Sequence, residues 1–122
     1  MIKGLGVDIV EIKRIEAAVN RNERFLTKLF SEDERAYFES SGKRMETVAG
    51  NFAAKEAVAK VFGTGIRNFN WVDIEVLRDD MGKPYVRLKD EAKKLSDQLG
   101  IIKIEVSISH CKEYAVANAI GY

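Results

Sequence analysis

The sequence of 122 residues has one cysteine, one proline and one histidine, and two of these scarcities exclude whole classes of site. The single cysteine, Cys111, excludes an internal disulfide and a zinc site built from several cysteines. The single histidine, His110, excludes a histidine-rich zinc site. The apolar runs are too short to cross a bilayer, so we expect no membrane-spanning segment.

The net charge is also close to zero. The sequence has 20 Lys and Arg residues and 19 Asp and Glu residues, which gives a net charge of +1. This balance argues against a general nucleic-acid-binding protein. The hydrophobic fraction of 46% is typical of a globular protein, and the length suits one domain over residues 1–122. Asp8 and Glu11 interrupt the apolar N-terminal stretch, so we expect no signal peptide and a cytoplasmic location.

The hydrophobic periodicity predicts one strand, then several helices, then a hairpin, a helix and a second hairpin. We expect strands over 3–10, 71–78, 85–88, 101–109 and 114–120, and helices over 12–19, 23–30, 31–40, 44–62 and 88–99. Strands joined by tight turns pair antiparallel, so the order indicates an α+β fold with helices packed against an antiparallel sheet. The last strand is apolar on both faces, which predicts contact with another subunit.

The segment FAAKEAVAK, residues 52–60, is the centre of the longest predicted helix, which is apolar almost all round. Glu56 and Lys60 lie four residues apart and therefore project from one face of it. They are consistent with a simple surface ion pair. A carboxylate on so apolar a helix is also consistent with a metal site, and the lysine with phosphate binding.

Asp8 lies in the middle of the first predicted strand, on the same face as Gly4 and Gly6. The two glycines leave that face open to something bulky. Two alternatives remain: an exposed carboxylate at a strand end, or a functional carboxylate. Together with Glu56, and without histidine, the functional alternative suits a hard cation such as Mg²⁺ completed by water and phosphate oxygens.

Basic residues follow the first strand and recur before the long helix. The first group contains Lys13, Arg14, Arg21 and Arg24. It is either a solvated helix face or a docking patch for an acidic partner. The pair at residues 43–44 stands at a helix start, where cations oppose the macrodipole and are sometimes kept to bind an anion.

Four motifs occur together in the chain: GVDIVEIKRI, FAAKEAVAKVFGTGI, GKPY and SISHCKEYAVA. In this order and spacing they resemble the holo-(acyl-carrier-protein) synthases, which are small bacterial 4′-phosphopantetheinyl transferases. The resemblance covers essentially the whole chain. It implies transfer of the 4′-phosphopantetheine arm of coenzyme A to a serine of acyl carrier protein, with release of adenosine 3′,5′-bisphosphate, in fatty acid biosynthesis.

The resemblance also assigns roles to individual residues. It implies a Mg²⁺ site at Asp8 and Glu56, a diphosphate-binding Lys60, and a His110 beside coenzyme A; these four are the expected catalytic residues. The other residues expected to line the coenzyme A site are Lys43, Arg44, Gly63, Thr64, Gly65, Lys83, Pro84 and Ser109. The residues expected to dock the carrier protein are Arg14, Arg21, Arg24 and Phe25. The family is trimeric, so a homotrimer with sites between subunits is expected.

One position departs from the family pattern. Relatives often carry Arg where this chain has Asn51, and if that Arg contacts a phosphate, Lys43 or Arg44 has to replace it here. The base for the serine hydroxyl is also left open among Glu56, Asp8 acting through water, and His110, with Glu56 or water favoured. Two alternative functions remain: a non-catalytic module that binds coenzyme A or a nucleotide, and a structural or nucleic-acid-binding oligomer.

Overall fold

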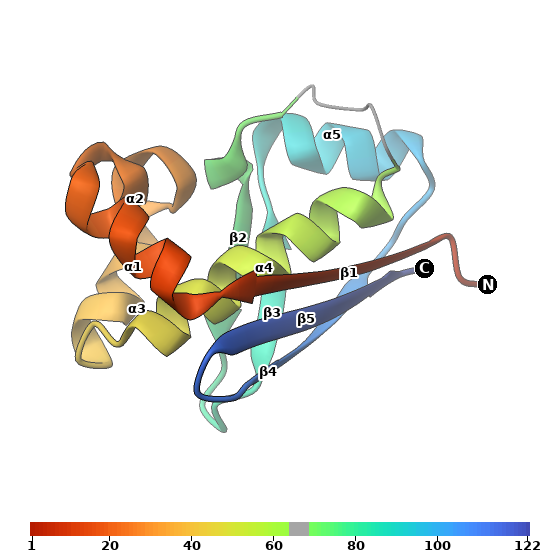
Figure 1. Cartoon of the computed structure of the whole chain (residues 1–122). Helices are drawn as coiled ribbons and strands as arrows, with labels where there is room; N and C mark the ends of the chain where they lie inside the picture. Colours follow the sequence, from red (N-terminus) through yellow and green to blue (C-terminus); the bar gives the residue numbers. More distant parts are fainter. Residues whose placement is uncertain (64–68) are drawn as a thin grey trace.

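A long central helix organises the computed structural model, which describes residues 1–63 and 69–122 (Figure 1). This helix, α4 (Met45–Val61), lies between a three-stranded sheet and a two-stranded sheet. The larger sheet is antiparallel and its strands follow the order β1 (Gly4–Glu11), β5 (Tyr114–Gly121) and β4 (Ile104–His110). The smaller sheet is the hairpin of β2 (Ile74–Arg78) and β3 (Pro84–Leu88).

The remaining helices cover the ends of this arrangement. Three short helices gather at one end of α4: α1 (Ile12–Arg21), α2 (Arg24–Leu29) and α3 (Glu32–Ser40). A 3₁₀ turn, η1 (Trp71–Asp73), precedes β2, and α5 (Asp90–Gln98) follows β3. The expected α+β fold with antiparallel pairing is therefore confirmed. Within the described ranges, every helix is too short or too polar to cross a membrane.

Three predicted boundaries were wrong. The strand expected from residue 71 begins at Ile74, because Trp71–Asp73 forms η1, in which the Asp73 carboxylate accepts a hydrogen bond from the Asn70 amide at 3.2 Å. The strand expected from residue 101 begins only at Ile104. Leu88 belongs to β3, so the helix that was expected from residue 88 starts at Asp90.

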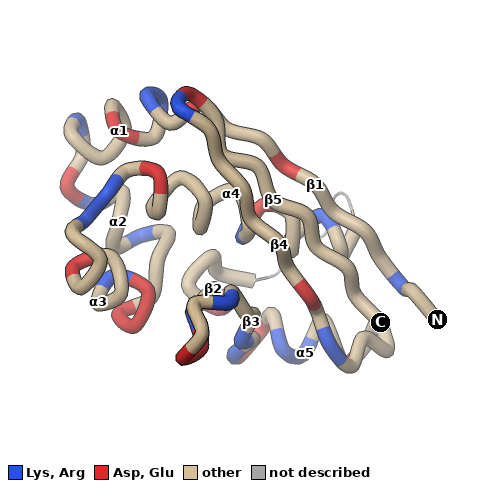
Figure 2. The backbone as a smooth tube through the Cα atoms, turned by 90° about the horizontal axis from the view of Figure 1, so that it is seen from below, with Lys and Arg blue, Asp and Glu red and all other residues tan. Residues whose placement is uncertain are grey.

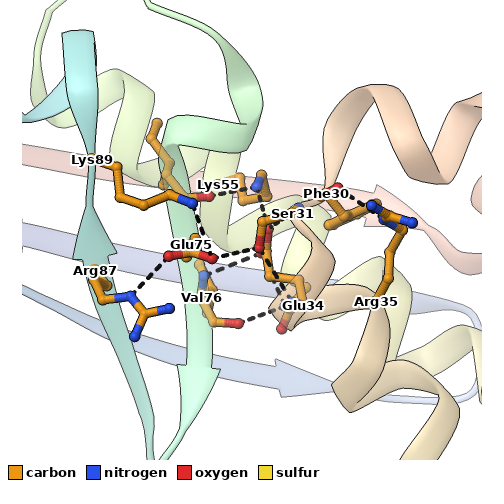
Figure 3. Close-up of polar contacts among 11 residues, drawn as sticks. Phe30, Ser31, Glu34, Arg35, Lys55, Glu75, Val76, Arg87 and Lys89 are labelled. Atoms are coloured by element: carbon orange, nitrogen blue, oxygen red, sulfur yellow. Dashed lines mark hydrogen bonds and ion pairs between the residues drawn. The ribbon is translucent and has the colours of Figure 1, made fainter.

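A fully buried carboxylate, that of Glu34, ties three elements together (Figure 3). Ser31 and Glu34 form a capping box at the start of α3, in which the Ser31 amide donates to Glu34 at 3.0 Å. The same carboxylate also accepts from Lys55 Nζ of α4 at 2.7 Å and from the Val76 amide of β2 at 3.1 Å. Burial lowers the pKa of Lys55, and the attraction of Glu34 partly offsets this effect.

A second buried carboxylate, that of Glu75, extends this network towards the hairpin surface. It accepts hydrogen bonds from Ser31 Oγ at 2.6 Å and from Arg87 Nε at 2.8 Å, and it lies 3.6 Å from Lys89 Nζ. Burial raises the pKa of Glu75, but the hydrogen bonds and charges of Arg87, Ser31 and Lys89 outweigh it and leave the pKa lowered. The carboxylates of Glu34 and Glu75 therefore hold α3, α4 and the hairpin as one unit.

The side chain of Asn51, the position where relatives often carry Arg, faces this network. Its side chain is fully buried and donates to the Val76 carbonyl at 2.8 Å and to Glu34 at 3.4 Å. An interior position against β2 has no access to a solvent-borne coenzyme.

We predict that Lys55→Met lowers the free energy of unfolding by about 3–5 kcal/mol, because it leaves the Glu34 carboxylate buried without its cation. Lys93→Met is the matched control, since Lys93 pairs with Asp97 on the exposed face of α5. The control should change stability by less than about 0.5 kcal/mol. Urea unfolding at pH 7 and one fixed chain concentration measures both. Equal losses for the two variants would contradict the anchoring role of Lys55.

Candidate active site

β1 lies directly on α4 through its glycine face. Gly4, Gly6 and Asp8 point towards the helix, as the alternation of the strand predicts. The bulky neighbour for which the glycines leave space is therefore α4 itself. Asp8 continues the same face beyond the glycines, and its side chain is 18% exposed. The alternative of a fully solvated strand-end carboxylate is thus wrong.

A cleft of about 700 Å³ opens beside Asp8, between β1, α1 and α4. Glu56 of α4 also lines it, so the two carboxylates singled out in the sequence meet at one cleft. The residues that line it are Asp8, Ile9, Val10, Glu11, Arg14, Ile15, Ala17, Ala18, Arg21, Phe52, Glu56 and Tyr114. One wall is thus apolar, whereas the rim carries charges of both signs.

Lys60 links α4 to β1 next to this cleft. Its ammonium group donates to the Val7 carbonyl at 2.9 Å and lies 3.3 Å from Asp8 Oδ1. Lys60 therefore pairs with Asp8 across two elements, which the sequence did not predict. A cation therefore already stands at the Asp8 carboxylate. Because half of the Lys60 side chain is exposed, a solute can also reach this cation.

Only some of the residues predicted to dock the carrier protein line this cleft. Arg14 and Arg21 line the cleft from α1. Phe25 of α2 stacks on Phe52, with ring centroids 6.2 Å apart, and Phe52 lines the cleft. Arg24 is exposed at the start of α2, where its backbone amide donates to the Asn22 side chain. The basic surface of α1 is therefore continuous with the cleft that holds the carboxylates.

Sequence reasoning missed the other residues of the cleft, among them Glu11, Phe52 and Tyr114. Phe52 could have been found, because it precedes Glu56 by four residues and must share its face of α4. Tyr114 lies opposite Glu11 in the β1–β5 ladder. No sequence pattern specifies that pairing, since it joins the two ends of the chain.

The other predicted coenzyme-binding residues lie away from this cleft. Asp8, Ala117 and Ile108 form one row across the sheet, and His110 lies two residues further along β4. Two strand spacings, about 10 Å, therefore separate the strands of Asp8 and His110. Helix α4 crosses the sheet obliquely, because its Gly50 meets Ile108 of β4 while its Ala57 meets Gly6 of β1.

Ser109, His110 and the β2–β3 turn form a second polar region on the β4 side of the molecule. Lys83 is exposed in that turn and contributes to lowering the pKa of Glu105 on β4, after the hydrogen bond from Tyr122 and the charge of Lys103. Pro84 is the first residue of β3. Cys111 is exposed in the β4–β5 turn, and hydrogen bonds from backbone groups of Glu113 and Tyr114 lower the pKa of its thiol.

The remaining basic residues lie at opposite ends of α4. Arg44 caps the start of the helix and Lys60 lies in its last turn, sixteen residues or about 24 Å away. Lys43 precedes Arg44 and pairs with Glu39 at 3.2 Å. No single diphosphate can contact both ends within one chain. Gly63 follows the helix with a φ of 100°, whereas Thr64 and Gly65 lie outside the described residues.

Asp8 and Glu56 fit a hard divalent cation by their chemistry. Both offer carboxylate oxygens to one cleft, and the Lys60 ammonium group already occupies a cation position at Asp8. Among residues 1–63 and 69–122, no three His, Cys, Asp or Glu side chains converge well enough to hold an ion. The remaining ligands would therefore come from water and phosphate, as Mg²⁺ commonly accepts.

The outer face of β1 in the larger sheet is apolar and exposed. Leu5, Val7 and Ile9 of β1 are 65%, 54% and 62% exposed, and Ile120 of β5 lies opposite Leu5. Figure 2 shows few charged residues along β1, β5 and β4, whereas charges crowd α1, α2 and α3. A contiguous apolar face of this kind is typical of a subunit interface.

Comparisons with known proteins agree over nearly the whole chain. Residues 4–119 match the model of the 4′-phosphopantetheinyl transferase superfamily. The holo-[acyl-carrier-protein] synthase of Alkaliphilus oremlandii is 54% identical over 121 residues, 99% of either chain. The Neisseria meningitidis synthase structure has a TM-score of 0.92 at 32% identity, covering 100% of this chain and 99% of that one. The Bacillus anthracis synthase in complex with coenzyme A (3′,5′-ADP) has a TM-score of 0.80 at 40% identity, covering 99% and 96%.

Proposed function

The chain belongs to the 4′-phosphopantetheinyl transferase superfamily, and we propose that it transfers the 4′-phosphopantetheine arm of coenzyme A to a serine of apo acyl carrier protein. Holo carrier protein and adenosine 3′,5′-bisphosphate are the products, and the reaction takes place in the cytoplasm. The observation that carries the proposal is the single cleft that joins Asp8 and Glu56 to the arginines of α1. This cleft brings together carboxylates that can bind a cation and arginines that can bind an acidic protein.

The reaction depends on Mg²⁺ held by Asp8 and Glu56. When bound, the ion supplies positive charge to the diphosphate of coenzyme A. The two carboxylates carry two negative charges, of which the Lys60 ammonium group offsets part at Asp8, so the cleft still attracts a cation. Water and phosphate oxygens complete its ligand set, because the described part of the chain offers no third His, Cys, Asp or Glu ligand there.

Lys60 provides a second positive charge for the diphosphate. Its ammonium group is anchored by the Val7 carbonyl and by Asp8, and its exposed half faces solvent. From there it stabilises the charge that develops on the phosphate oxygen as the phosphoanhydride bond breaks. A fixed cation lowers the barrier because it needs no reorganisation during the reaction.

The attacking serine must lose its hydroxyl proton as the new phosphoester bond forms. Glu56, or a water beside it, accepts that proton, since its carboxylate lines the cleft into which the serine must reach. The electron pair of the broken bond stays on adenosine 3′,5′-bisphosphate. The residues of the chain therefore position the two substrates and neutralise the charge of the diphosphate. No covalent enzyme intermediate is needed.

The basic surface of α1, together with Phe25 beside it, binds the carrier protein. Arg14 and Arg21 line the cleft, so a partner held by them presents its serine next to Asp8 and Glu56. Arg24 extends the positive charge to α2. Attraction to an acidic carrier protein speeds encounter, and added salt slows it.

The complete site is built from two copies within a homotrimer. Lys60 lies about 24 Å from Arg44, and the strands of Asp8 and His110 are two strand spacings, about 10 Å, apart. The region of Lys43, Arg44, Lys83, Pro84, Ser109 and His110 therefore serves the cleft of a neighbouring copy. The exposed apolar face of Leu5, Val7 and Ile9 offers the contact surface that such an assembly requires.

We predict that apo acyl carrier protein gains about 340 Da, one phosphopantetheine arm, when incubated with this chain, coenzyme A and Mg²⁺. Intact-mass spectrometry measures the gain. Asp8→Asn and Glu56→Gln should each slow it by about a hundredfold or more, because each removes charge from the cation site. Glu91→Gln, on the exposed surface of α5, is the control and should react at the wild-type rate.

The gain should also disappear with a chelator and return when Mg²⁺ is added back. No gain in the presence of intact coenzyme A binding would contradict the transferase proposal and favour a non-catalytic coenzyme A-binding module. Near-normal turnover of Glu56→Gln at saturating Mg²⁺ would remove Glu56 from the mechanism while leaving the reaction itself in place.

We also predict that two inactive variants restore activity when they assemble together. Glu56→Gln lacks the carboxylate side of the site, and His110→Ala lacks the β4 side. Co-expression with two affinity tags yields mixed trimers in which about a third of the sites combine an intact copy of each side. Activity near that level supports sites between subunits. Mixed trimers that stay as inactive as the parent variants would instead indicate sites within one chain.

A further inference from the structure

Gly6 stands where β1 comes closest to α4. A Cβ atom at Gly6 would lie 1.9 Å from the Ala57 carbonyl oxygen, 2.8 Å from the Ala57 carbonyl carbon and 3.2 Å from Lys60 Cβ. Non-bonded heavy atoms normally rest at about 3.5 Å, so any side chain would force the two backbones apart by about 1 Å. The atoms in the way are mainly helix backbone, which cannot turn aside as a side chain can.

This contact adjoins both carboxylates of the cleft. Asp8 follows Gly6 by two residues on the same strand face, and Glu56 is the residue directly before Ala57. Every residue of β1 is also paired to β5, from Gly4 with Gly121 to Glu11 with Tyr114. Because both elements are regular and fixed elsewhere, a displacement at Gly6 carries through to the separation of Asp8 and Glu56.

Lys60 depends on the same contact. The stem of Lys60 passes Gly6 with its Cβ 3.2 Å from the position of the missing side chain, and its ammonium group continues to Val7 and Asp8. The absence of a side chain at Gly6 therefore sets the path of the lysine as well as the spacing of the carboxylates.

We propose that Gly6 is a positioning residue that sets the distance between Asp8 and Glu56 and thereby selects a small divalent cation over a larger one. This inference rests on the proposed cation role of those two carboxylates. Mg²⁺ requires oxygen ligands at about 2.0–2.1 Å in a near-ideal octahedron, whereas Ca²⁺ accepts about 2.3–2.6 Å in flexible geometries. A pair of carboxylates moved apart by about 1 Å therefore suits Ca²⁺ better than Mg²⁺.

Gly6→Ala tests the proposal, and the relevant readout is cation selectivity in the coenzyme A complex. Mn²⁺ bound to the chain is followed by the loss of its free electron paramagnetic resonance signal, and Mg²⁺ or Ca²⁺ then displaces it. Coenzyme A without the chain gives the background. We expect the Mg²⁺ affinity of Gly6→Ala to fall about tenfold more than its Ca²⁺ affinity.

Two further variants separate positioning from general destabilisation. In Gly121→Ala the new Cβ meets the Val61 side chain at 2.6 Å, so the packing against α4 suffers without displacement of β1 at Asp8; selectivity should stay as in the wild type. In Gly4→Ala the new Cβ meets the Val61 carbonyl oxygen at 2.4 Å, further from Asp8, and a smaller shift towards Ca²⁺ should follow.

The outcomes distinguish this inference from the proposed function beneath it. A wild-type complex that holds no Mn²⁺ would overturn both, because there would be no cation for Asp8 and Glu56 to position. A wild-type complex that binds Mn²⁺, with an unchanged Mg²⁺ to Ca²⁺ ratio in Gly6→Ala, would overturn only the positioning role. If Gly6→Ala does not fold, an unchanged Mg²⁺ to Ca²⁺ ratio in Gly4→Ala would overturn the positioning role in the same way.

Discussion

The backbone contact between β1 and α4 is the constraint on which the proposed site depends. It exists only because Gly4 and Gly6 have no side chains, since a Cβ at either would overlap the carbonyl oxygens of Val61 or Ala57. One carboxylate comes from the strand and the other from the helix, so their separation depends on the separation of the two backbones. A site built on two regular elements holds its geometry better than one built on loops.

Neighbouring residues of α4 divide the work of anchoring and chemistry. Lys55 turns inward to the buried carboxylate of Glu34, whereas Glu56, about 100° further round the helix, lines the cleft. The hairpin and α3 therefore hold one side of the helix through charge and hydrogen bonds. The glycine face of β1 holds the other side through close packing. A helix fixed from both sides presents Glu56 in one position relative to Asp8.

The sequence predicted most of the architecture, because the alternation of β1 and β5 and the capping box at Ser31 are local signals. Sequence reasoning failed where a residue with a local role also makes contacts with residues far away in the sequence. Glu34 reads as a capping residue, yet it also binds Lys55 and Val76, and Asn51 joins the same interior rather than a phosphate site. The pairing of Lys60 with Asp8 and the position of Tyr114 at the cleft depend on which strands become neighbours, which periodicity does not specify.

The anomalous scattering of Mn²⁺ in crystals grown with coenzyme A tests the central claim most directly. The account predicts one strong peak in each chain, within about 2.5 Å of carboxylate oxygens of both Asp8 and Glu56, across the contact of β1 with α4. A peak away from the carboxylates of both Asp8 and Glu56 would contradict it. So would a peak bound by phosphate oxygens alone, because the two carboxylates would then have no part in holding the cation.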